Sequence, residues 1–293
     1  MKRRQTVRRI EIIAILAVVI VSLSVGFYLA LNSGDPRSVV DGKLVSPTDF
    51  ANLHAAAVAA YGESGSQYLP DVHNLTATGW SLVKPIVVYA GAEYCPFCAV
   101  QRYSIILALM RFGNFTDLHY MTSALGDGDY STFTFYNSTY HSNYISFQPY
   151  ELEDRSYNTL QTLPSNYTTA FDQQGKGDFP FLNFNDQYYI SGAILDPSVL
   201  GSMNQTQVIS AILAGNTVGS EIRQAANVIT AVICETTGNK PTSVCNNASI
   251  TALTMVSYIS PSAGSGSELF LTSSVFLRSP IASGAGKDYL GMN

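Results

Sequence analysis

The sequence has few charged residues and no evident basic surface. Charged residues make up 13% of the 293 residues, about half of the usual share. Five of the 16 basic residues lie within the first nine positions, and without these and Glu11 the remainder holds 11 basic and 20 acidic residues. This acidic remainder offers no basic face to phosphate, so we expect no nucleic-acid partner. Its surface of neutral polar groups stays soluble when carboxylates protonate, which indicates an acidic or otherwise harsh exterior.

Only four cysteines are present, and they form two close pairs, Cys95 with Cys98 and Cys234 with Cys245. An even set of paired cysteines is typical of an oxidising compartment outside the cytoplasm. A zinc site at Cys95 and Cys98 would need two further ligands, which Cys234 and Cys245 could supply. The second pair, however, comes late in a separate helical segment, and thiols in an oxidising compartment tend to form disulfides. We therefore predict no metal site and no cofactor.

Residues 12–31 form an uncharged, apolar run of 20 residues. A helix of this length spans about 30 Å, the thickness of the hydrocarbon core of a bilayer. The basic residues before it favour a cytoplasmic N-terminus. The alternative is a cleaved signal peptide, whose apolar core is usually shorter. We predict a cytoplasmic basic segment (1–11), a single-pass plasma-membrane anchor (12–31) and an extracytoplasmic remainder.

Six N-x-[ST] triplets agree with an extracytoplasmic location. Glycosylation requires this triplet in an exposed part of a translocated chain. The predicted acceptors are Asn74, Asn114, Asn137, Asn166, Asn204 and Asn247.

The anchor is followed by three predicted regions. Residues 32–79 form a linker with a helical segment at 48–61, residues 80–250 form an α/β domain with a long insertion at 126–178, and residues 251–293 form a Ser/Gly-rich tail. Periodicity and turn residues predict the elements of the domain. They are strands at 84–91 and 118–123, helices at 99–112, 205–213 and 220–234, a helix opened by Asp196-Pro197, a hairpin of 133–136 with 144–147, and a hairpin of 180–184 with 187–191.

The sequence Cys95-Pro96-Phe97-Cys98 lies between the first of these strands and its helix. Unpaired N–H groups and the helix dipole at a helix N-terminus stabilise a thiolate. We therefore predict that Cys95 is an exposed nucleophile and that Cys98, buried one turn further on, resolves its mixed disulfides.

The chain resembles a membrane-anchored, thioredoxin-like family of unknown function, found mainly in thermoacidophilic archaea and actinobacteria. The matching stretches are residues 91–98, 111–115, 132–135, 144–147, 180–181, 190–193 and 225–245. The resemblance implies a thioredoxin-like fold in which a cis-proline, Pro180, opens the strand that faces the cysteines. Phe179, Pro96 and Phe97 are then expected to contact a substrate.

Two functions remain open at this stage. The first is an extracytoplasmic thiol–disulfide oxidoreductase acting on secreted or surface proteins, with protein thiols or disulfides as its substrates and an unknown redox partner. The second is a redox-inert surface protein of the same fold with two structural disulfides. Cys234 and Cys245 are expected to form a structural disulfide, with a shuttle role as the alternative. Glu93 is interpreted as a proton acceptor, as a charge that raises the thiol pKa, or as a surface residue without a role.

Overall fold

The computed structural model describes residues 40–59, 61–75 and 84–253. The predicted cytoplasmic segment (1–11), the predicted anchor (12–31), residues 32–39 of the linker and nearly all of the tail lie outside these ranges. No helix among the residues described is both long and apolar enough to cross a membrane.

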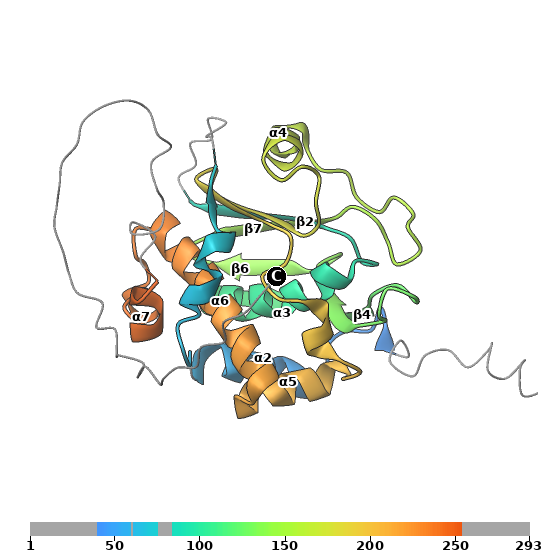
Figure 1. Ribbon diagram of the computed structural model, residues 1–293, viewed down its shortest axis with the longest axis horizontal. Coiled ribbons are helices and arrows are strands. Elements are labelled where there is room, and N and C mark those ends of the chain that lie inside the picture. The colour runs from blue at the N-terminus through green and yellow to red at the C-terminus, as the bar shows by residue number, and fades with distance from the viewer. Residues whose placement is uncertain (1–39, 60, 76–83, 254–293) are drawn as a thin grey trace, which may run out of the picture. The chain divides into compact units, whose positions relative to one another are not determined.

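A mixed five-stranded sheet organises the chain (Figure 1). Its order is β1-β9-β8-β2-β7, in which β2 and β7 are parallel neighbours and the other neighbouring pairs are antiparallel. The strands are β1 (His73–Asn74), β2 (Ile86–Gly91), β7 (Ser146–Glu151), β8 (Phe181–Phe184) and β9 (Tyr188–Ser191). The predicted strand at 84–91 is confirmed as β2, which occupies an interior position of the sheet.

The predicted hairpin of β8 and β9 is also confirmed. Asn185 and Asp186 form its two-residue turn, and both have φ in the left-handed region, at 53° and 57°. Asn and Asp tolerate this conformation better than other non-glycine residues, which is why they favour such turns. β8 pairs with β2 so that Phe181 faces Ala90. Pro180, one residue earlier, therefore comes level with Gly91, where β2 ends.

The predicted hairpin of 133–136 with 144–147 is wrong. β5 (Ser131–Thr134) pairs instead with β4 (His119–Thr122), and β7 pairs with β2. A third pair joins β3 (Gly113–Thr116) to β6 (Thr139–Ser142). The two aromatic runs still meet in the core, where the rings of Phe135 and Phe147 are 5.1 Å apart. Phe135 and Phe147 are thus buried against each other without strand pairing between the two runs.

The helices confirm most of the sequence predictions. The α-helices are α2 (Pro47–Ala59), α3 (Pro96–Met110), α4 (Ser165–Gln173), α5 (Gln205–Ala214), α6 (Thr217–Thr236), α7 (Thr242–Cys245) and α8 (Ala248–Thr251). Two 3-10 helices, η2 (Ser66–Asp71) and η3 (Pro197–Leu200), complete the list. The helix predicted to open at Asp196-Pro197 is thus η3, with the Asp196 side chain accepting the Ser198 N–H as its cap.

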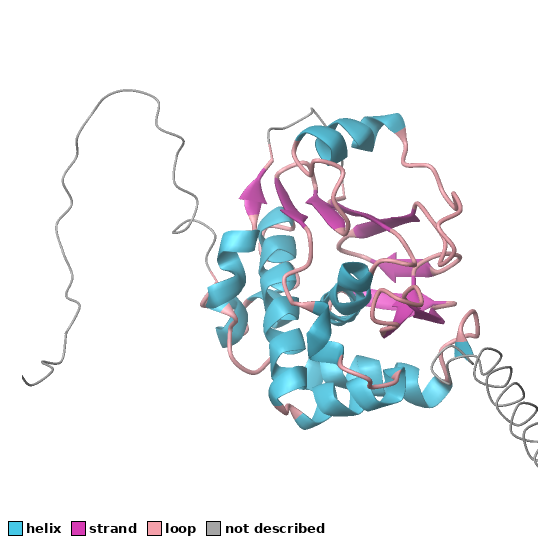
Figure 2. Cartoon of the chain, turned by 45° about the vertical axis from the view of Figure 1, so that its right-hand side comes forward, coloured by secondary structure: helices cyan, strands magenta, loops and turns pink. Residues whose placement is uncertain are grey.

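The sheet lies between unequal helical layers (Figures 1 and 2). On one face, Ile86 and Val88 of β2 pack with Tyr167 of α4. On the other, Val87 and Tyr89 belong to the main core with residues of α3, α5 and α6. Successive strand residues point to opposite faces, so β2 is apolar on both sides because both faces are covered.

Candidate functional site

The cysteine pair lies at the junction of β2 and α3. Cys95 is the N-cap of α3, and its Sγ accepts a hydrogen bond of 3.1 Å from the backbone N–H of Cys98. Pro96 follows as the first helical residue, where its missing N–H leaves no bond unmade. Both cysteines are unbridged thiols. The cap puts the Cys95 sulfur where backbone N–H groups favour negative charge.

The two thiols have opposite acidities. The hydrogen bond with the Cys98 side chain is the main cause that lowers the pKa of Cys95, and burial opposes it. The backbone N–H of Cys98 and the charge of Arg102 lower this pKa further. Burial is the main cause that raises the pKa of Cys98 well above its usual value, and the hydrogen bond with Cys95 adds to it. Of the pair, Cys95 is therefore the thiol that ionises first.

The expectation that the Cys95 sulfur is exposed is wrong. Cys95 is only 5% exposed and Cys98 is fully buried. The two cysteines and Ala92 form a small cluster outside the main core, covered by the partly buried side chains of Tyr94 and Phe179. Cys95 therefore belongs to this small cluster and not to the main core.

Phe179 and Pro180 directly precede β8, the strand that pairs with β2. The bond between them is cis, and Phe179 packs directly on the cysteine cluster. Its ring also stacks on Phe171 of α4, with centroids 5.7 Å apart. Of the other expected contact residues, Pro96 is half-buried and Phe97 is 48% exposed. The substrate roles of these residues remain predictions.

Two loops border the site, one that starts just before the predicted insertion at 126–178 and one that lies within it. Ala124 donates its N–H to the carbonyl of Tyr94, and the carbonyl of Glu153 accepts the N–H of Glu93. Tyr157, from the second loop, lies with its ring 4.3 Å from that of Tyr94. Tyr157 and Leu125 are 55% and 80% exposed. These neighbours could not be predicted from the sequence, because contacts between distant loops leave no periodic pattern.

Glu93 is not a surface residue. It is 6% exposed, and its carboxylate accepts a hydrogen bond of 2.7 Å from the Thr134 hydroxyl. Burial raises its pKa, while the Thr134 hydrogen bond acts in the opposite direction. A buried carboxyl held by Thr134 contradicts the surface interpretation and leaves the other two interpretations of Glu93 as hypotheses.

A buried ion pair below the cysteines was missed by sequence reasoning. Arg102, in the second turn of α3, binds Glu151 at the end of β7. Both side chains are completely buried. The one available signal was an arginine inside an otherwise apolar helical stripe, since a charge in such a stripe usually needs a buried partner.

Cys234 and Cys245 form the expected disulfide. It joins the last turn of α6 to the end of α7. Both sulfurs are engaged, so they cannot complete a four-cysteine metal site with Cys95 and Cys98. Within the ranges the structure describes, no group of three or more His, Cys, Asp or Glu side chains could hold a metal ion.

The predicted glycosylation acceptors are accessible. Five of the six asparagines are exposed and Asn247 is half-buried. Asn204 and Asn247 also cap α5 and α8 with their side-chain oxygens. Accessibility is necessary for modification, and the glycosylation itself remains a prediction.

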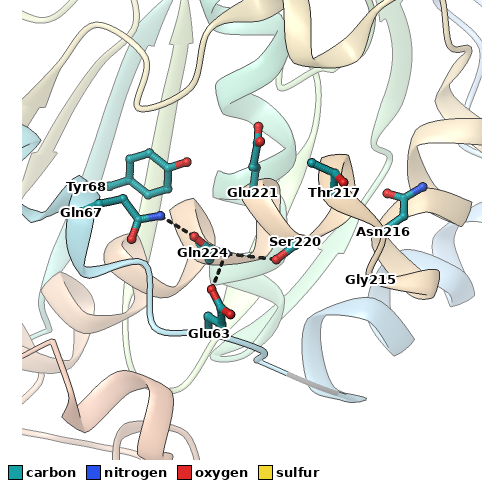
Figure 3. A pocket seen from close by; sticks show the side chains of 9 residues that line it. All are labelled: Glu63, Gln67, Tyr68, Gly215, Asn216, Thr217, Ser220, Glu221 and Gln224. Carbon is teal, nitrogen blue, oxygen red and sulfur yellow. Dashed lines mark hydrogen bonds between the residues drawn. The ribbon is translucent and has the colours of Figure 1, made fainter. Parts of the chain in front are cut away.

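A separate polar cleft of about 530 Å³ lies beside the start of α6 (Figure 3). Gln224 is its centre, with hydrogen bonds to Gln67, Glu63 and Ser220. Asn216, the N-cap of α6, and Glu221 also line it. None of the predicted site residues lines this cleft, and its buried amide already has partners.

The comparisons with known proteins identify a family. A family model described as a domain of unknown function (DUF929) matches residues 80–235. The chain belongs to this family. The comparison with curated proteins found no match, and the comparison with solved structures found none either. The matched range contains Cys95, Cys98 and Pro180 but ends before Cys245, so it covers the candidate site and only one cysteine of the disulfide.

Proposed function

We propose that this DUF929 protein is an extracytoplasmic, membrane-anchored thiol–disulfide oxidoreductase that acts on secreted or surface proteins. The observation that carries the proposal is the cap on α3, where the Cys98 N–H donates to the Cys95 sulfur. A fixed donor at a helix N-terminus stabilises the thiolate, which is the nucleophile in disulfide exchange. The lowered pKa of Cys95 and the raised pKa of Cys98 fit an attacking and a resolving thiol.

We propose that the fold is thioredoxin-like. Its support is the succession of β2, the cysteine turn and α3, with the β8–β9 hairpin antiparallel to β2. Pro180 precedes β8, and Phe179 lies on the cysteine cluster. In this arrangement a substrate segment would contact Phe179, Pro96 and Phe97, with Tyr157 and Leu125 at the border.

The proposed exchange has two steps. The Cys95 thiolate attacks a client disulfide, forms a bond to one client sulfur and releases the other as a thiolate, which takes a proton from water. Cys98, as a thiolate, then attacks the Cys95 sulfur, so that the Cys95–Cys98 bond forms and the first client sulfur leaves. The client is reduced and the pair is oxidised. The reverse sequence oxidises a client, and in either direction a separate redox partner must reset the pair.

The rival function is a redox-inert surface protein in which the first pair is also a structural disulfide. The small exposure of Cys95, 5%, favours it. The reduction potential of the pair separates the two. Catalytic disulfides have potentials of about −120 to −270 mV, whereas structural ones lie below about −300 mV. A reduction potential below about −300 mV would reject the exchange function.

Trapping of clients gives an independent test. In Cys98→Ser the resolving thiol is absent, so mixed disulfides on Cys95 should accumulate in cells and disappear on reduction. Cys95→Ser/Cys98→Ser is the control, because it keeps the fold and lacks the nucleophile. The same set of mixed disulfides from both variants would contradict the proposal.

Membrane anchoring by residues 12–31 is part of the proposal. The full chain should stay with membranes after a carbonate wash at high pH, while a chain that starts at residue 32 should stay in the supernatant. Release of the full chain by the wash would contradict the anchor. The exchange function does not depend on this result.

A further inference from the structure

The ion pair between Arg102 and Glu151 is the most deeply buried charge arrangement described in the structure. Arg102 Nε donates to Glu151 Oε1 at 3.0 Å, and Nη2 donates to Oε2 at 2.7 Å. Both side chains have zero exposure. The carboxylate also accepts the backbone N–H of Phe135 at 3.2 Å. This two-point contact fixes the plane of the guanidinium.

The pair adjoins the segment from the end of β2 to Cys98. Arg102 follows Cys98 by four residues in α3, which puts both side chains on one face of the helix. Its Nη2 also donates to the carbonyl of Ala92 at 2.8 Å, and Ala92 packs in the same cluster as both cysteines. Glu151 lies opposite Gly91 in the β2–β7 register. Both partners therefore adjoin the segment that carries the reactive thiols.

Stability alone does not explain this pair. Desolvation of two charges often exceeds their mutual attraction, and an apolar pair of similar volume is frequently as stable. In addition, Nη1 of Arg102 is buried and has no hydrogen-bond partner among the residues described. Buried donors are nearly always paired. A guanidinium with a spare buried N–H retains capacity to stabilise a further negative charge.

The buried Cys98 thiol is where such a charge must form if the exchange function holds. Burial is the main cause that raises the pKa of Cys98, and the positive charge of Arg102 acts against it. The charge of Glu151 raises this pKa, by less than Arg102 lowers it. Removing both charges should therefore make the Cys98 thiolate harder to form.

We propose that Arg102, held in place by Glu151, is a positioning residue that stabilises the Cys98 thiolate during resolution of the mixed disulfide. The inference rests on the proposed exchange function. In the step concerned, Cys98 loses its proton to water and its thiolate attacks the Cys95 sulfur. The Cys95–Cys98 bond forms, the bond from Cys95 to the client sulfur breaks, and the client leaves as a thiolate. Arg102 takes no part in bond making.

An aryl disulfide with a coloured thiolate tests the inference on the reduced protein. Attack by Cys95 releases the first aryl thiolate, and attack by Cys98 releases the second. We expect Arg102→Met/Glu151→Gln to keep the first phase and to slow the second about 3- to 10-fold at pH 7. The midpoint pH of the second phase should rise. The double variant removes both charges together, so it leaves no buried charge unpaired. The glutamine also retains an acceptor for the Phe135 N–H.

Two further variants separate electrostatics from general damage. Arg102→Lys keeps the positive charge, so the rate of its second phase should lie closer to that of wild type than to that of the double variant. Arg111→Met removes the other buried arginine of this helix region, which bonds Asn227 and Thr230, and should leave the midpoint unchanged. An unchanged midpoint in the folded double variant would overturn the role of Arg102 while the exchange function stands. Absence of both phases in the wild-type protein would instead reject the exchange function itself.

Discussion

Phe179 lies against the cluster that contains Cys95, 84 residues further along the chain. It packs on the cluster of Ala92, Cys95 and Cys98, and its ring stacks on Phe171 of α4. The helix α4 lies in the predicted insertion, so this part of the chain holds Phe179 against the cluster. Displacement of Phe179, Tyr94 or both would therefore open the cluster that contains Cys95.

Replacement of Phe179 by alanine should uncover the thiol. The Phe171–Phe179 stack contributes about 0.5–1.5 kcal/mol to the closed arrangement, so we expect Phe179→Ala to speed alkylation of Cys95 about 2- to 10-fold. The rate of iodoacetamide labelling at fixed pH, read by mass spectrometry, measures it. Tyr144→Ala is the control, since this exposed aromatic residue precedes β7 at the end opposite Glu151. Equal rates in wild type and Phe179→Ala would show that Phe179 is not the barrier.

The pH dependence of this labelling reports the thiol pKa. The hydrogen bond with the Cys98 side chain is the largest cause that lowers the pKa of Cys95. The labelling midpoint of wild-type Cys95 should therefore lie below that of an unperturbed cysteine. Cys98→Ala removes the side-chain donor and should move the midpoint upward, whereas Cys98→Ser retains a donor and should move it less. Identical midpoints in the two variants would exclude this hydrogen bond as the cause.

Local sequence patterns predicted much of the fold, and distant contacts escaped them. The strand β2 and the Asn185-Asp186 turn are determined by short stretches of consecutive residues, so both were predicted correctly. The partners of β5 and β7 depend on which sheet edge each strand meets, and a short aromatic run does not encode that choice. Phe179 follows Cys95 by 84 positions, and Glu151 follows its partner Arg102 by 49. A single sequence shows no pattern for such contacts.

Asp41 should make the fold more stable in acid. Burial raises its pKa from 3.8 to about 6, although Thr122 and Arg155 act in the opposite direction. Because the folded-state pKa exceeds the unfolded one, its contribution to stability is complete below about pH 4 and is lost as the pH rises through about 6. The free energy of unfolding of Asp41→Asn should therefore exceed that of wild type by about 1 kcal/mol at pH 7.5 and by little at pH 4. The figure is reduced for the partial exposure of Asp41 to solvent.

Urea unfolding at the two pH values measures this difference. Asp172→Asn, which changes an exposed carboxylate of α4, controls for the change in net charge. A gain that is equal at both pH values would show that Asp41 does not carry the effect. A protein stabilised by protonation of Asp41 would suit the acidic exterior that the low charge content indicates.

The Cys234–Cys245 disulfide should contribute to stability and not to exchange. Its loop spans 11 positions, for which chain entropy gives a contribution of about 2–3 kcal/mol. Both cysteines are nearly inaccessible, at 2% and 3% exposure. We expect Cys234→Ala/Cys245→Ala to lower the free energy of unfolding by this amount and to leave both phases of aryl thiolate release unchanged. If the second phase or the recycling of Cys98 slowed while the fold persisted, the pair would be a shuttle for oxidising equivalents, and the structural assignment would be wrong.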